Sequence, residues 1–227
     1  MFTDIHSHVI WGVDDGAQAP EETWQMLRAA AADGIGRIIC TPHVTPGVYE
    51  FPEETFQKHF EEASAFIARE GLPLQLFRGS EILYTDNTPR LLRERKVAPI
   101  EFSPTDTRQH ILDALQRVSG AGFLPILAHM ERYPAIGKTE QVEELKSRCH
   151  ALVQINARTV TRKQPLLRRR FFDSLFVEGL ADFLATDVHA LPGRETCMTA
   201  GMDAVRRRYG EAVAQRLQDA PEILFRG

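Results

Sequence analysis

Short apolar runs alternate along this chain with longer segments in which apolar residues recur at helical spacing, and this alternation restricts the fold more than any other feature. Strands that alternate with helices favour a parallel sheet covered by helices. With seven such runs in 227 residues, a barrel accommodates the units more economically than two doubly wound domains. The runs that we predict as strands are residues 2–5, 37–40, 74–77, 98–102, 124–128, 152–155 and 180–185.

The segments between the runs have the spacing of amphipathic helices. In residues 52–70, Phe56, Ala63 and Phe66 fall on one helical face. Pro20 stands where a helix can begin without losing a needed N–H donor, residues 111–118 indicate a third helix, and a short helix is expected after Tyr209. We therefore predict an α/β fold, a (β/α) barrel with seven strands, in one domain that spans residues 1–227.

The composition argues against several classes of protein. The formal net charge is −4, with 27 basic and 31 acidic residues, whereas a protein that grips nucleic acid usually carries a basic excess. No stretch approaches the roughly 20 apolar residues of a membrane span, and residues 1–6 lack the basic and apolar regions of a signal peptide. The three cysteines form no CxxC pair, which fits a reducing compartment. We expect a cytoplasmic protein without a membrane span or a nucleic-acid partner.

Polar residues that can carry chemistry gather at the predicted strand ends, where a β/α barrel builds its function. Five of the eight histidines fall there, whereas His59, His110 and His150 fall on or beside helices and are expected to pack or lie on the surface. This partition indicates that the five imidazoles converge on one point. The residues at the strand ends are His6, His8, Asp14, Asp15, His43, Glu81, Glu101, His129, Glu131, Arg132, Asn156, Asp187, His189 and Arg194.

These residue types are those of a metal-dependent phosphoesterase. Neutral imidazole and carboxylate are the usual ligands of Zn, Mn and Fe. His6 and His8 are two residues apart and so share one face of a strand, and Asp187 and His189 repeat that spacing. Glu81 is the natural carboxylate to bridge ions packed close together. Clustered metal ions suit phosphate ester hydrolysis, because they lower the pKa of a bound water and neutralise charge on the phosphoryl oxygens.

The two arginines at the strand ends have a functional and a structural interpretation. Arg132 and Arg194 could hold phosphate oxygens in a bidentate fork. Each could instead form an ion pair with its neighbour in the sequence, which is Glu131 or Glu195.

The carboxylates at the strand ends also have structural interpretations. Of the two adjacent aspartates, Asp14 and Asp15, Asp14 is the more natural candidate for a structural partner. Asp15 precedes Gly16 and could belong to a turn. Glu81 could cap a helix, and Glu101 could occupy a solvent-facing position at a sheet edge.

A basic stretch follows the sixth predicted strand. Arg158, Arg162 and Lys163 come first, and residues 168–170 are three further arginines. The default interpretation is a solvated helix face. The alternative is a rim that attracts acidic substrates to the strand ends.

An ordered set of motifs makes the sequence resemble the PHP (polymerase and histidinol phosphatase) superfamily. The set covers nearly the whole chain and is specific as a set, although each piece alone would be weak. The chain is most similar to the bacterial tyrosine-protein phosphatases of capsule and exopolysaccharide operons, the group of CpsB, CapC and YwqE. Three features carry that similarity: Asp14-Asp15-Gly16, the run from Ala128 to Tyr133, and Arg194 seven residues after Asp187. The superfamily motifs are Asp4-Ile5-His6-Ser7-His8, Thr41-Pro42-His43, Gly79-Ser80-Glu81, Ala128-His129 and Thr186-Asp187-Val188-His189.

The resemblance implies a distorted (β/α)7 barrel of PHP type and a phosphotyrosine hydrolase with three metal ions, often manganese, with iron or zinc as alternatives. Its substrate would be an autophosphorylated tyrosine kinase that governs polysaccharide export, and Arg132 and Arg194 would bind the phosphate. We expect a metal-activated hydroxide to displace the tyrosine oxygen without a phosphoenzyme. By the resemblance, His6, His8, Glu81 and Asp187 would hold the first ion, Glu81, Glu101 and His129 the second, and Asp15, His43 and His189 the third.

Other classes of phosphatase and nucleotide-binding protein lack their residues in this sequence. A cysteine-based tyrosine phosphatase needs an arginine six positions after its cysteine, but those positions hold Pro46, Ile155 and Asp203. The chain has no P-loop, and Ile39 replaces the third glycine of a dinucleotide fingerprint that would begin at Gly34. Three alternatives stay open: a small-molecule phosphatase of the histidinol-phosphate type, a PHP exonuclease, which the acidic charge disfavours, and a metal-binding module without catalysis.

Overall fold

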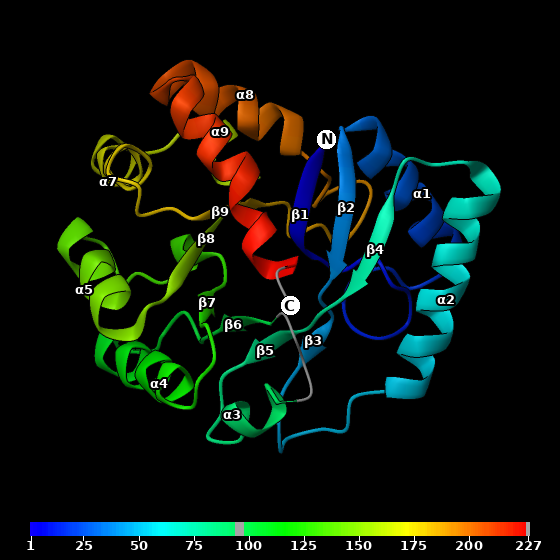
Figure 1. Cartoon of the computed structure of the whole chain (residues 1–227), viewed down its shortest axis with the longest axis horizontal. Helices are drawn as coiled ribbons and strands as arrows, with labels where there is room; N and C mark the ends of the chain where they lie inside the picture. The colour runs from blue at the N-terminus through cyan, green and yellow to red at the C-terminus, as the bar shows by residue number, and fades with distance from the viewer. Residues whose placement is uncertain (94–97, 226–227) are drawn as a thin grey trace.

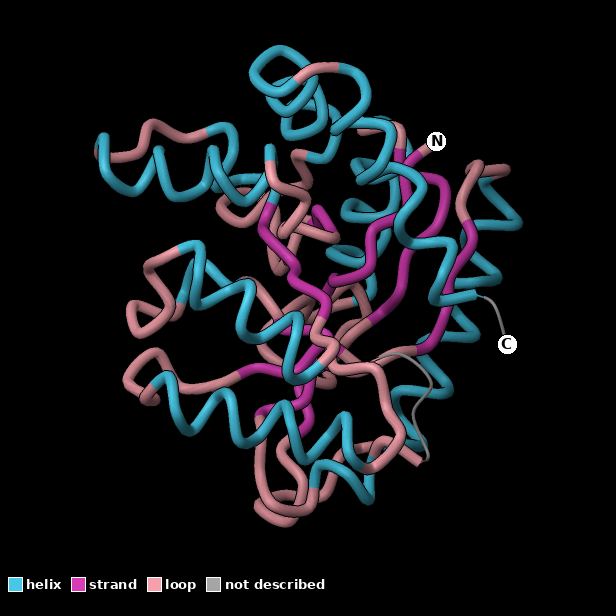
Figure 2. Tube along the Cα trace, turned by 60° about the vertical axis from the view of Figure 1, so that its left-hand side comes forward, coloured by secondary structure: helices cyan, strands magenta, loops and turns pink. Residues whose placement is uncertain are grey.

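A group of short parallel strands forms the centre of the fold, and helices surround it (Figures 1 and 2). The computed structural model describes residues 1–93 and 98–225. Apolar runs of this length suit strands that are buried on both faces. The strands are β1 (Phe2–Ser7), β2 (Ile35–Cys40), β3 (His43–Val44), β4 (Gln75–Arg78), β5 (Glu81–Leu83), β6 (Pro99–Glu101), β7 (Ile126–Leu127), β8 (Leu152–Asn156) and β9 (Phe183–Ala185).

The predicted helices are confirmed, and several begin or end where the sequence indicates. Pro20 is the first residue of its helix. Thr107 caps another by accepting a hydrogen bond from the His110 N–H at 3.2 Å. Gly71 ends a third with a φ of 63°, which glycine adopts without strain. The helices are α1 (Pro20–Ala32), α2 (Glu53–Glu70), α3 (Thr88–Leu91), α4 (Arg108–Gly120), α5 (Thr139–Cys149), α6 (Ala157–Thr161), α7 (Leu166–Val177), α8 (Met198–Tyr209) and α9 (Glu211–Asp219), with the 3₁₀-helices η1 (Met130–Arg132) and η2 (Ala220–Phe225).

The strands form two parallel sheets within the described residues, in the orders β1-β2-β4 and β3-β5-β6-β7-β8-β9. A parallel bridge between Ser7 and Val188 brings the end of β1 beside the segment after β9. The N–H of His8 donates to the Val188 carbonyl, and the N–H of Asp187 to the His6 carbonyl, both at 2.9 Å. The fold is therefore mixed α/β with parallel sheets, as predicted. Closure of these two sheets into one seven-stranded barrel stays a prediction.

Two of the predicted strands continue beyond an interruption that the sequence analysis did not resolve. Pro42, which has no N–H to donate, separates β2 from β3. Gly79 and Ser80 separate β4 from β5. The described residues therefore contain nine short strands where seven were predicted, because β3 and β5 are too short to show as apolar runs. These two pieces carry His43 and Glu81 at their first positions.

Three predicted strands are shorter than their apolar runs. The run 98–102 becomes β6, and Pro99 is its first residue, where a missing N–H is tolerated. The run 124–128 becomes β7. The run 180–185 becomes β9, because the N–H of Leu180 donates to the Leu175 carbonyl at 2.8 Å and thereby closes the end of α7 instead of joining a sheet.

Two clusters of buried apolar side chains stabilise this arrangement. The larger fills the space between strands and helices. In the smaller, Ile39 of β2 and Ile126 of β7 belong to one cluster although these strands lie in different sheets, so both sheets contribute side chains to it. Phe225 of η2 packs against it, with its ring 4.7 Å from that of Phe77. Burying each such side chain contributes roughly 1.5–3 kcal/mol.

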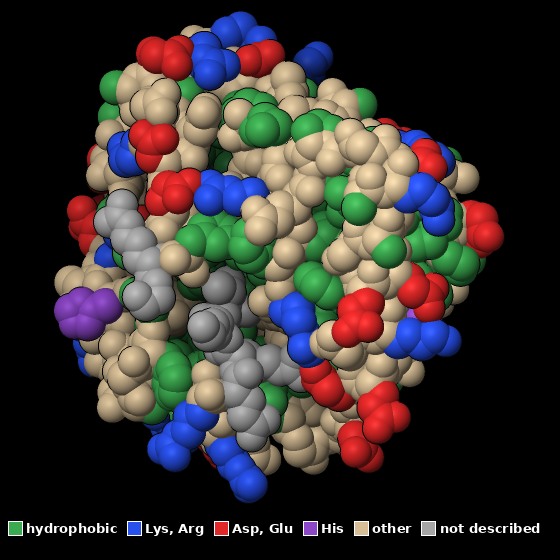
Figure 3. Space-filling view, turned by 45° about the vertical axis from the view of Figure 1, so that its right-hand side comes forward, with side chains coloured by type: hydrophobic (Ala, Val, Ile, Leu, Met, Phe, Trp, Pro, Cys, Tyr) green, Lys and Arg blue, Asp and Glu red, His purple; other side chains and the backbone are tan. Residues whose placement is uncertain are grey.

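The surface shown in Figure 3 carries basic and acidic side chains interspersed, with hydrophobic side chains between them. This mixture matches the near balance of 27 basic and 31 acidic residues in the chain. None of the helices in residues 1–93 and 98–225 is both long enough and apolar enough to cross a membrane.

Candidate metal centre

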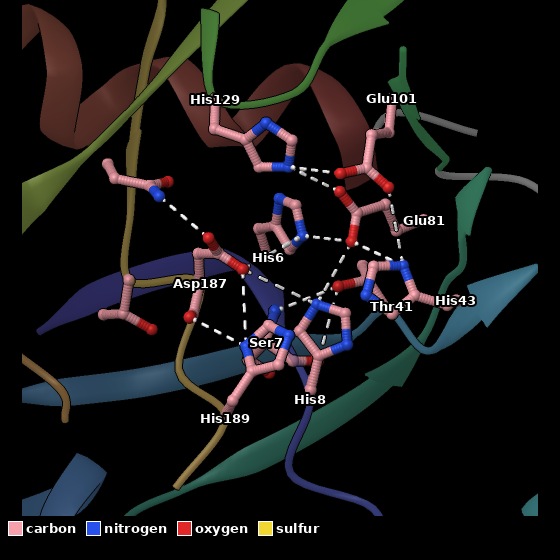
Figure 4. Close-up of polar contacts among 12 residues, drawn as sticks. His6, Ser7, His8, Thr41, His43, Glu81, Glu101, His129, Asp187 and His189 are labelled. Atoms are coloured by element: carbon pink, nitrogen blue, oxygen red, sulfur yellow. Dashed lines mark hydrogen bonds and ion pairs between the residues drawn. The ribbon is translucent and has the colours of Figure 1, made fainter. Parts of the chain in front are cut away.

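All nine residues predicted as metal ligands lie together in one cluster beside the ends of the strands. His6 lies on β1 and His8 just after it, His43 on β3, Glu81 on β5 and Glu101 on β6. Loops supply the others, because Asp15 follows β1, His129 follows β7, and Asp187 and His189 follow β9. Figure 4 shows the imidazole rings and carboxylates converging on a common space. Several strands and the loops that follow them therefore deliver polar side chains to one place, which is the convergence that the strand-end pattern predicted.

Four overlapping groups of these side chains have the proximity that a metal ion requires. Within each group, the ligand atoms lie within 4.8 Å of one another. His6, His8, His43 and Glu81 each belong to two groups, so the groups form one continuous cluster. The groups are His6, His8 and Asp187; His6, Glu81 and His129; His43, Glu81 and Glu101; and His8, Asp15, His43 and His189.

Glu81 lies at the centre of the cluster. Its Oε2 atom is 3.0 Å from Nε2 of His6, 3.2 Å from Nε2 of His8 and 3.1 Å from Nδ1 of His43. Its Oε1 atom is 2.6 Å from Nε2 of His129. A carboxylate with imidazoles beside both oxygens is placed to bridge ions. Glu81 lies on β5 and does not cap a helix, which was the alternative interpretation.

Five buried polar atoms of the cluster make no hydrogen bond within the described residues. Only seven such side-chain atoms occur in that part of the chain, so their concentration here is a property of the site. An unpaired buried polar group costs about 1–3 kcal/mol. Imidazole nitrogens and carboxylate oxygens form a donor set that fits Zn, Mn or Fe, so these residues fit a group of metal ions. The atoms are Nε2 of His6, His8 and His189, Oε2 of Glu81 and Oδ1 of Asp187.

The second nitrogen of three histidines is held by a hydrogen bond, which fixes the orientation of each ring. Nδ1 of His8 lies 2.7 Å from Oδ2 of Asp14, so Asp14 is the structural partner that the sequence suggested. Nδ1 of His189 lies 3.0 Å from the Asp187 carbonyl oxygen. Nδ1 of His6 lies 3.1 Å from Oε1 of Gln154. In each case, Nε2 is left to face the cluster.

Gln154 is a supporting residue that the sequence analysis missed. Its Oε1 also accepts a hydrogen bond from the His129 N–H at 2.7 Å, and its Nε2 donates to Oδ1 of Asn156 at 2.6 Å. Gln154 thereby fixes two ligands from opposite parts of the chain. The available signal was a single amide side chain, fully buried, inside the apolar run 152–155.

The backbone is strained at two of these residues. His129 has a φ of 31° and Asp187 a φ of 53°, in the left-handed region that residues other than glycine rarely adopt. Such conformations persist only where the surroundings hold them, and they are enriched at functional sites. The Gln154 contact holds the His129 N–H, and the His6 carbonyl accepts the Asp187 N–H at 2.9 Å.

Burial and neighbouring charges shift the pKa values of the cluster in both directions. Burial would raise the pKa of Glu81, but the charges of His6 and His129 hold it well below its usual range. Burial and the charge of His8 lower the pKa of His189 to about 4, so His189 is neutral at pH 7. Burial would lower the pKa of His8, but its contacts with the Asp14 and Glu81 carboxylates raise it to about 10. A cation at this position would displace that proton.

Glu101 lies nearer to solvent than the other strand-borne carboxylate, Glu81. Burial and the charge of Glu81 raise the pKa of Glu101 to about 7. Its Oε1 atom lies 3.6 Å from Nε2 of His129 and 3.2 Å from Nη1 of Arg132, and its Oε2 atom lies 3.7 Å from Nδ1 of His43. Glu101 therefore faces the cluster and does not occupy the solvent-facing edge position that was its structural alternative.

Arg132 and Arg194 lie at the edge of the cluster and share one partner. Both donate from Nη2 to Oδ2 of Asp187, at 3.0 and 2.6 Å, and Nδ2 of Asn156 donates to the same oxygen at 2.8 Å. Asp187 thus presents Oδ2 to the arginines and Oδ1 to the imidazoles. Both arginines line a cavity of about 480 Å³ beside the cluster. In the part of the chain that the structure describes, neither pairs with the adjacent Glu131 or Glu195.

The three remaining histidines lie outside the cluster, as predicted. The ring of His59 stacks on Trp11 with centroids 4.0 Å apart. His110 makes an edge contact with Phe102. His150 ends α5 in a left-handed conformation. Their roles are therefore packing and termination of secondary structure.

The sequence of this chain matches a known family over almost its whole length. The family described as "Capsular polysaccharide synthesis, CpsB/CapC" matches residues 2–225. The chain belongs to the CpsB/CapC family. This confirms the resemblance inferred from the ordered motifs.

Named relatives and solved structures agree with this membership. This CpsB/CapC protein is 30% identical over 231 residues to the tyrosine-protein phosphatase CpsB of Streptococcus pneumoniae. The aligned region covers 94% of this chain and 93% of that protein. It is 26% identical over 237 residues to the tyrosine-protein phosphatase YwqE of Bacillus subtilis, and that alignment covers 98% of this chain and 91% of YwqE.

The same fold occurs in two solved structures. A crystal structure of YwqE from Bacillus subtilis and CpsB from Streptococcus pneumoniae, described as unique metal-dependent tyrosine phosphatases, matches with a TM-score of 0.86 at 24% identity, over 99% of this chain and 94% of that one. Histidinol phosphate phosphatase of Lactococcus lactis matches with a TM-score of 0.60 at 15% identity, over 95% and 93%. Both likenesses concern the fold.

Proposed function

We propose that this CpsB/CapC protein is a metal-dependent protein-tyrosine phosphatase. The observation that carries the proposal is the set of five buried atoms without a hydrogen bond, all imidazole nitrogens or carboxylate oxygens, beside two arginines that line a cavity. That donor set suits metal ions, and the arginines suit a phosphoryl group. The relatives named tyrosine-protein phosphatase favour phosphotyrosine as the substrate.

We propose that the cluster holds three ions, with manganese preferred over iron or zinc. His6, His8, Glu81 and Asp187 would hold one, Glu81, Glu101 and His129 a second, and Asp15, His43 and His189 a third. The four overlapping groups of ligand atoms support a site for several ions, because every proposed ligand belongs to at least one of them. Glu101 and His129 fall in different groups, and Glu81 is the ligand that those two groups share. Bound there, the ions would lower the pKa of a water molecule and neutralise charge on the phosphoryl oxygens.

Arg132 and Arg194 would bind and orient the phosphoryl group. Asp187 fixes both guanidinium groups, so they are positioned before the substrate arrives. Arg194 uses only Nη2 for this contact. Within the described residues its other side-chain N–H groups make no hydrogen bond, so they can donate to phosphoryl oxygens. Donors placed in advance where charge develops in the transition state lower the barrier most. Transfer to water, without a phosphoenzyme, completes the proposed reaction.

Phosphate release tests the proposal. Purified protein loaded with manganese is given a phosphotyrosine peptide, a phosphoserine peptide and histidinol phosphate, each with and without EDTA. Release that EDTA abolishes and that favours the phosphotyrosine peptide is expected. Preference for histidinol phosphate would retain the metal site and replace the substrate. Bound metal without release from any of these compounds would favour a module that binds metal without catalysis.

The physiological partner that we propose is a tyrosine autokinase that controls capsular or exopolysaccharide synthesis in the cytoplasm. This rests on the description of the family and on the names of the relatives. The expected result is that the purified protein removes phosphate from the autophosphorylated kinase of its own capsule operon. Phosphorylation that persists after incubation with active enzyme would remove this partner.

We propose further that the two sheets behave as one distorted (β/α)7 barrel within a single domain of residues 1–227. The bridge between Ser7 and Val188 and the apolar cluster shared by β2 and β7 support it. One cooperative unfolding transition is expected by calorimetry, with equal calorimetric and van't Hoff enthalpies. Two separate transitions would contradict a single domain.

A further inference from the structure

The cavity beside the cluster carries more positive charge than the phosphoryl group requires. Beyond Arg132 and Arg194, its lining includes Arg158, Arg162 and Arg168. Only two carboxylates line the same cavity, those of Glu131 and Asp187. Because the whole chain has a net charge of −4, a concentration of five arginines around one cavity runs against its overall charge. We call Arg158, Arg162 and Arg168 the arginine rim.

The contacts of the arginine rim leave its charge without a carboxylate partner within the described residues. Arg158 donates to the Gly193 carbonyl at 2.7 Å, and Arg168 donates to the Glu131 carbonyl at 2.7 Å. These bonds orient the guanidinium groups but do not neutralise them, because a carbonyl carries no net charge. Arg162 is exposed and makes no side-chain hydrogen bond or ion pair in that part of the chain.

The carboxylates of the cavity make their hydrogen bonds to residues outside the arginine rim. Asp187 accepts from Arg132, Arg194 and Asn156. Glu131 accepts from the Asn156 N–H at 2.9 Å and from the Thr159 hydroxyl at 2.8 Å, which holds the end of β8 against η1. Neither faces the arginine rim as an ion-pair partner. An anion from outside the chain would therefore meet three charged guanidinium groups, of which those of Arg158 and Arg168 are held in place by hydrogen bonds.

We propose that the arginine rim binds an acidic side chain next to the phosphotyrosine in the substrate, so that the enzyme selects acidic sequence context. This inference rests on the proposed function, because the rim and the phosphoryl-binding arginines line one cavity. A volume of about 480 Å³ exceeds the space for a phosphoryl group alone and lies within the range of pockets that bind larger ligands. Guanidinium groups are suited to carboxylates through paired N–H donors. A concave site favours a peptide over a membrane surface.

The test measures kcat/KM for three phosphotyrosine peptides that differ only in the flanking residues, which are Glu and Asp, Gln and Asn, or Lys. The wild-type enzyme is compared with the variant Arg162→Glu/Arg168→Glu. The matched control is Lys163→Glu/Arg170→Glu, which makes the same change of charge in the same segments. Neither Lys163 nor Arg170 lines the cavity.

The wild type is expected to prefer the acidic over the neutral peptide, by up to about fivefold for each exposed ion pair. The preference should shrink as salt is added, because exposed charges are screened. Arg162→Glu/Arg168→Glu should reverse the order and favour the Lys peptide, a gain that misfolding cannot produce. The control variant should keep the acidic preference, and KM should change more than kcat.

The outcomes separate this inference from the proposed function. Equal hydrolysis of all three peptides by the wild type would overturn the arginine rim as a specificity site and leave the phosphatase in place. If the wild type shows no preference among the peptides but binds phosphatidylglycerol vesicles, the rim would serve a membrane, and its role in peptide selection would likewise be overturned. Release from none of the peptides would remove the proposed function and this inference with it.

Discussion

The ligand cluster has an inner half and an outer half, and the two differ in how much they depend on a bound cation. The side chains of the inner half are at most 5% exposed, whereas those of Asp15, His43 and Glu101 are 65%, 31% and 18% exposed. Water can satisfy polar atoms in the outer half, but only a ligand can satisfy those inside. The inner half consists of His6, His8, Glu81, His129, Asp187 and His189.

The largest effect is expected from removing two inner ligands together. His6→Ala/His8→Ala should abolish phosphatase activity and lower the bound metal in parallel. Loss of a partner that merely orients a ligand costs about 10–100-fold, so loss of two ligands should exceed about 100-fold. Steady-state assays with metal analysis by mass spectrometry give both quantities. A double variant that keeps full activity would remove the metal hypothesis and, with it, the distinction between the two halves.

Metal removal should destabilise the fold through the inner half. A ligand that binds only the folded state at 100 times its Kd stabilises it by about 2.7 kcal/mol. The wild type should therefore unfold at a lower temperature after dialysis against EDTA and recover when Mn²⁺ is restored, as measured by calorimetry. His6→Ala/His8→Ala serves as the control, and its unfolding temperature should respond far less to Mn²⁺. A wild-type Tm that does not change with Mn²⁺ would show that the inner half is stable without a bound cation.

Asp14 tests whether orientation of an inner ligand matters apart from ligation. Asp14→Ala removes the carboxylate at 2.7 Å from Nδ1 of His8 and should lower activity by about 10–100-fold. Asp14→Asn can still accept a hydrogen bond from His8 through its amide oxygen, so it should recover part of that loss. Assays at several Mn²⁺ concentrations show whether added metal compensates. Equal loss in both variants would indicate that the charge of Asp14 matters more than the hydrogen bond.

The inner half is also the part that the sequence predicted best. His6 and His8, and likewise Asp187 and His189, stand two residues apart, and parallel strands place their carboxyl ends together, so local spacing was enough to expect convergence. The seven apolar runs likewise predicted where strands lie along the chain, because a short apolar run between helical segments is a local pattern. The ligand roles of these residues stay predictions, because proximity does not identify an ion.

What the sequence could not reveal depends on contacts between distant residues. Gln154 supports His6 from 148 positions away, and nothing in the run 152–155 indicates that partner. Arg132 meets Asp187 across 55 positions, whereas its sequence neighbour Glu131 had been the alternative. β3 and β5 were missed because pieces of two and three residues show no periodicity. Local pattern therefore finds the candidate ligands and a near neighbour such as Asp14, and tertiary structure finds the distant residues that orient them.

The smallest effect is expected at the outer edge of the cluster. Oδ1 of Asp15 lies 3.3 Å from Nε2 of both His43 and His189, yet its side chain is 65% exposed. Water can replace the carboxylate in Asp15→Asn, so activity should fall by less than about tenfold, below the range for inner-half support. Metal content should fall by no more than one ion per chain. A loss as large as that of His6→Ala/His8→Ala would show that exposure does not predict dependence on the ion, and the two halves would then act as one unit.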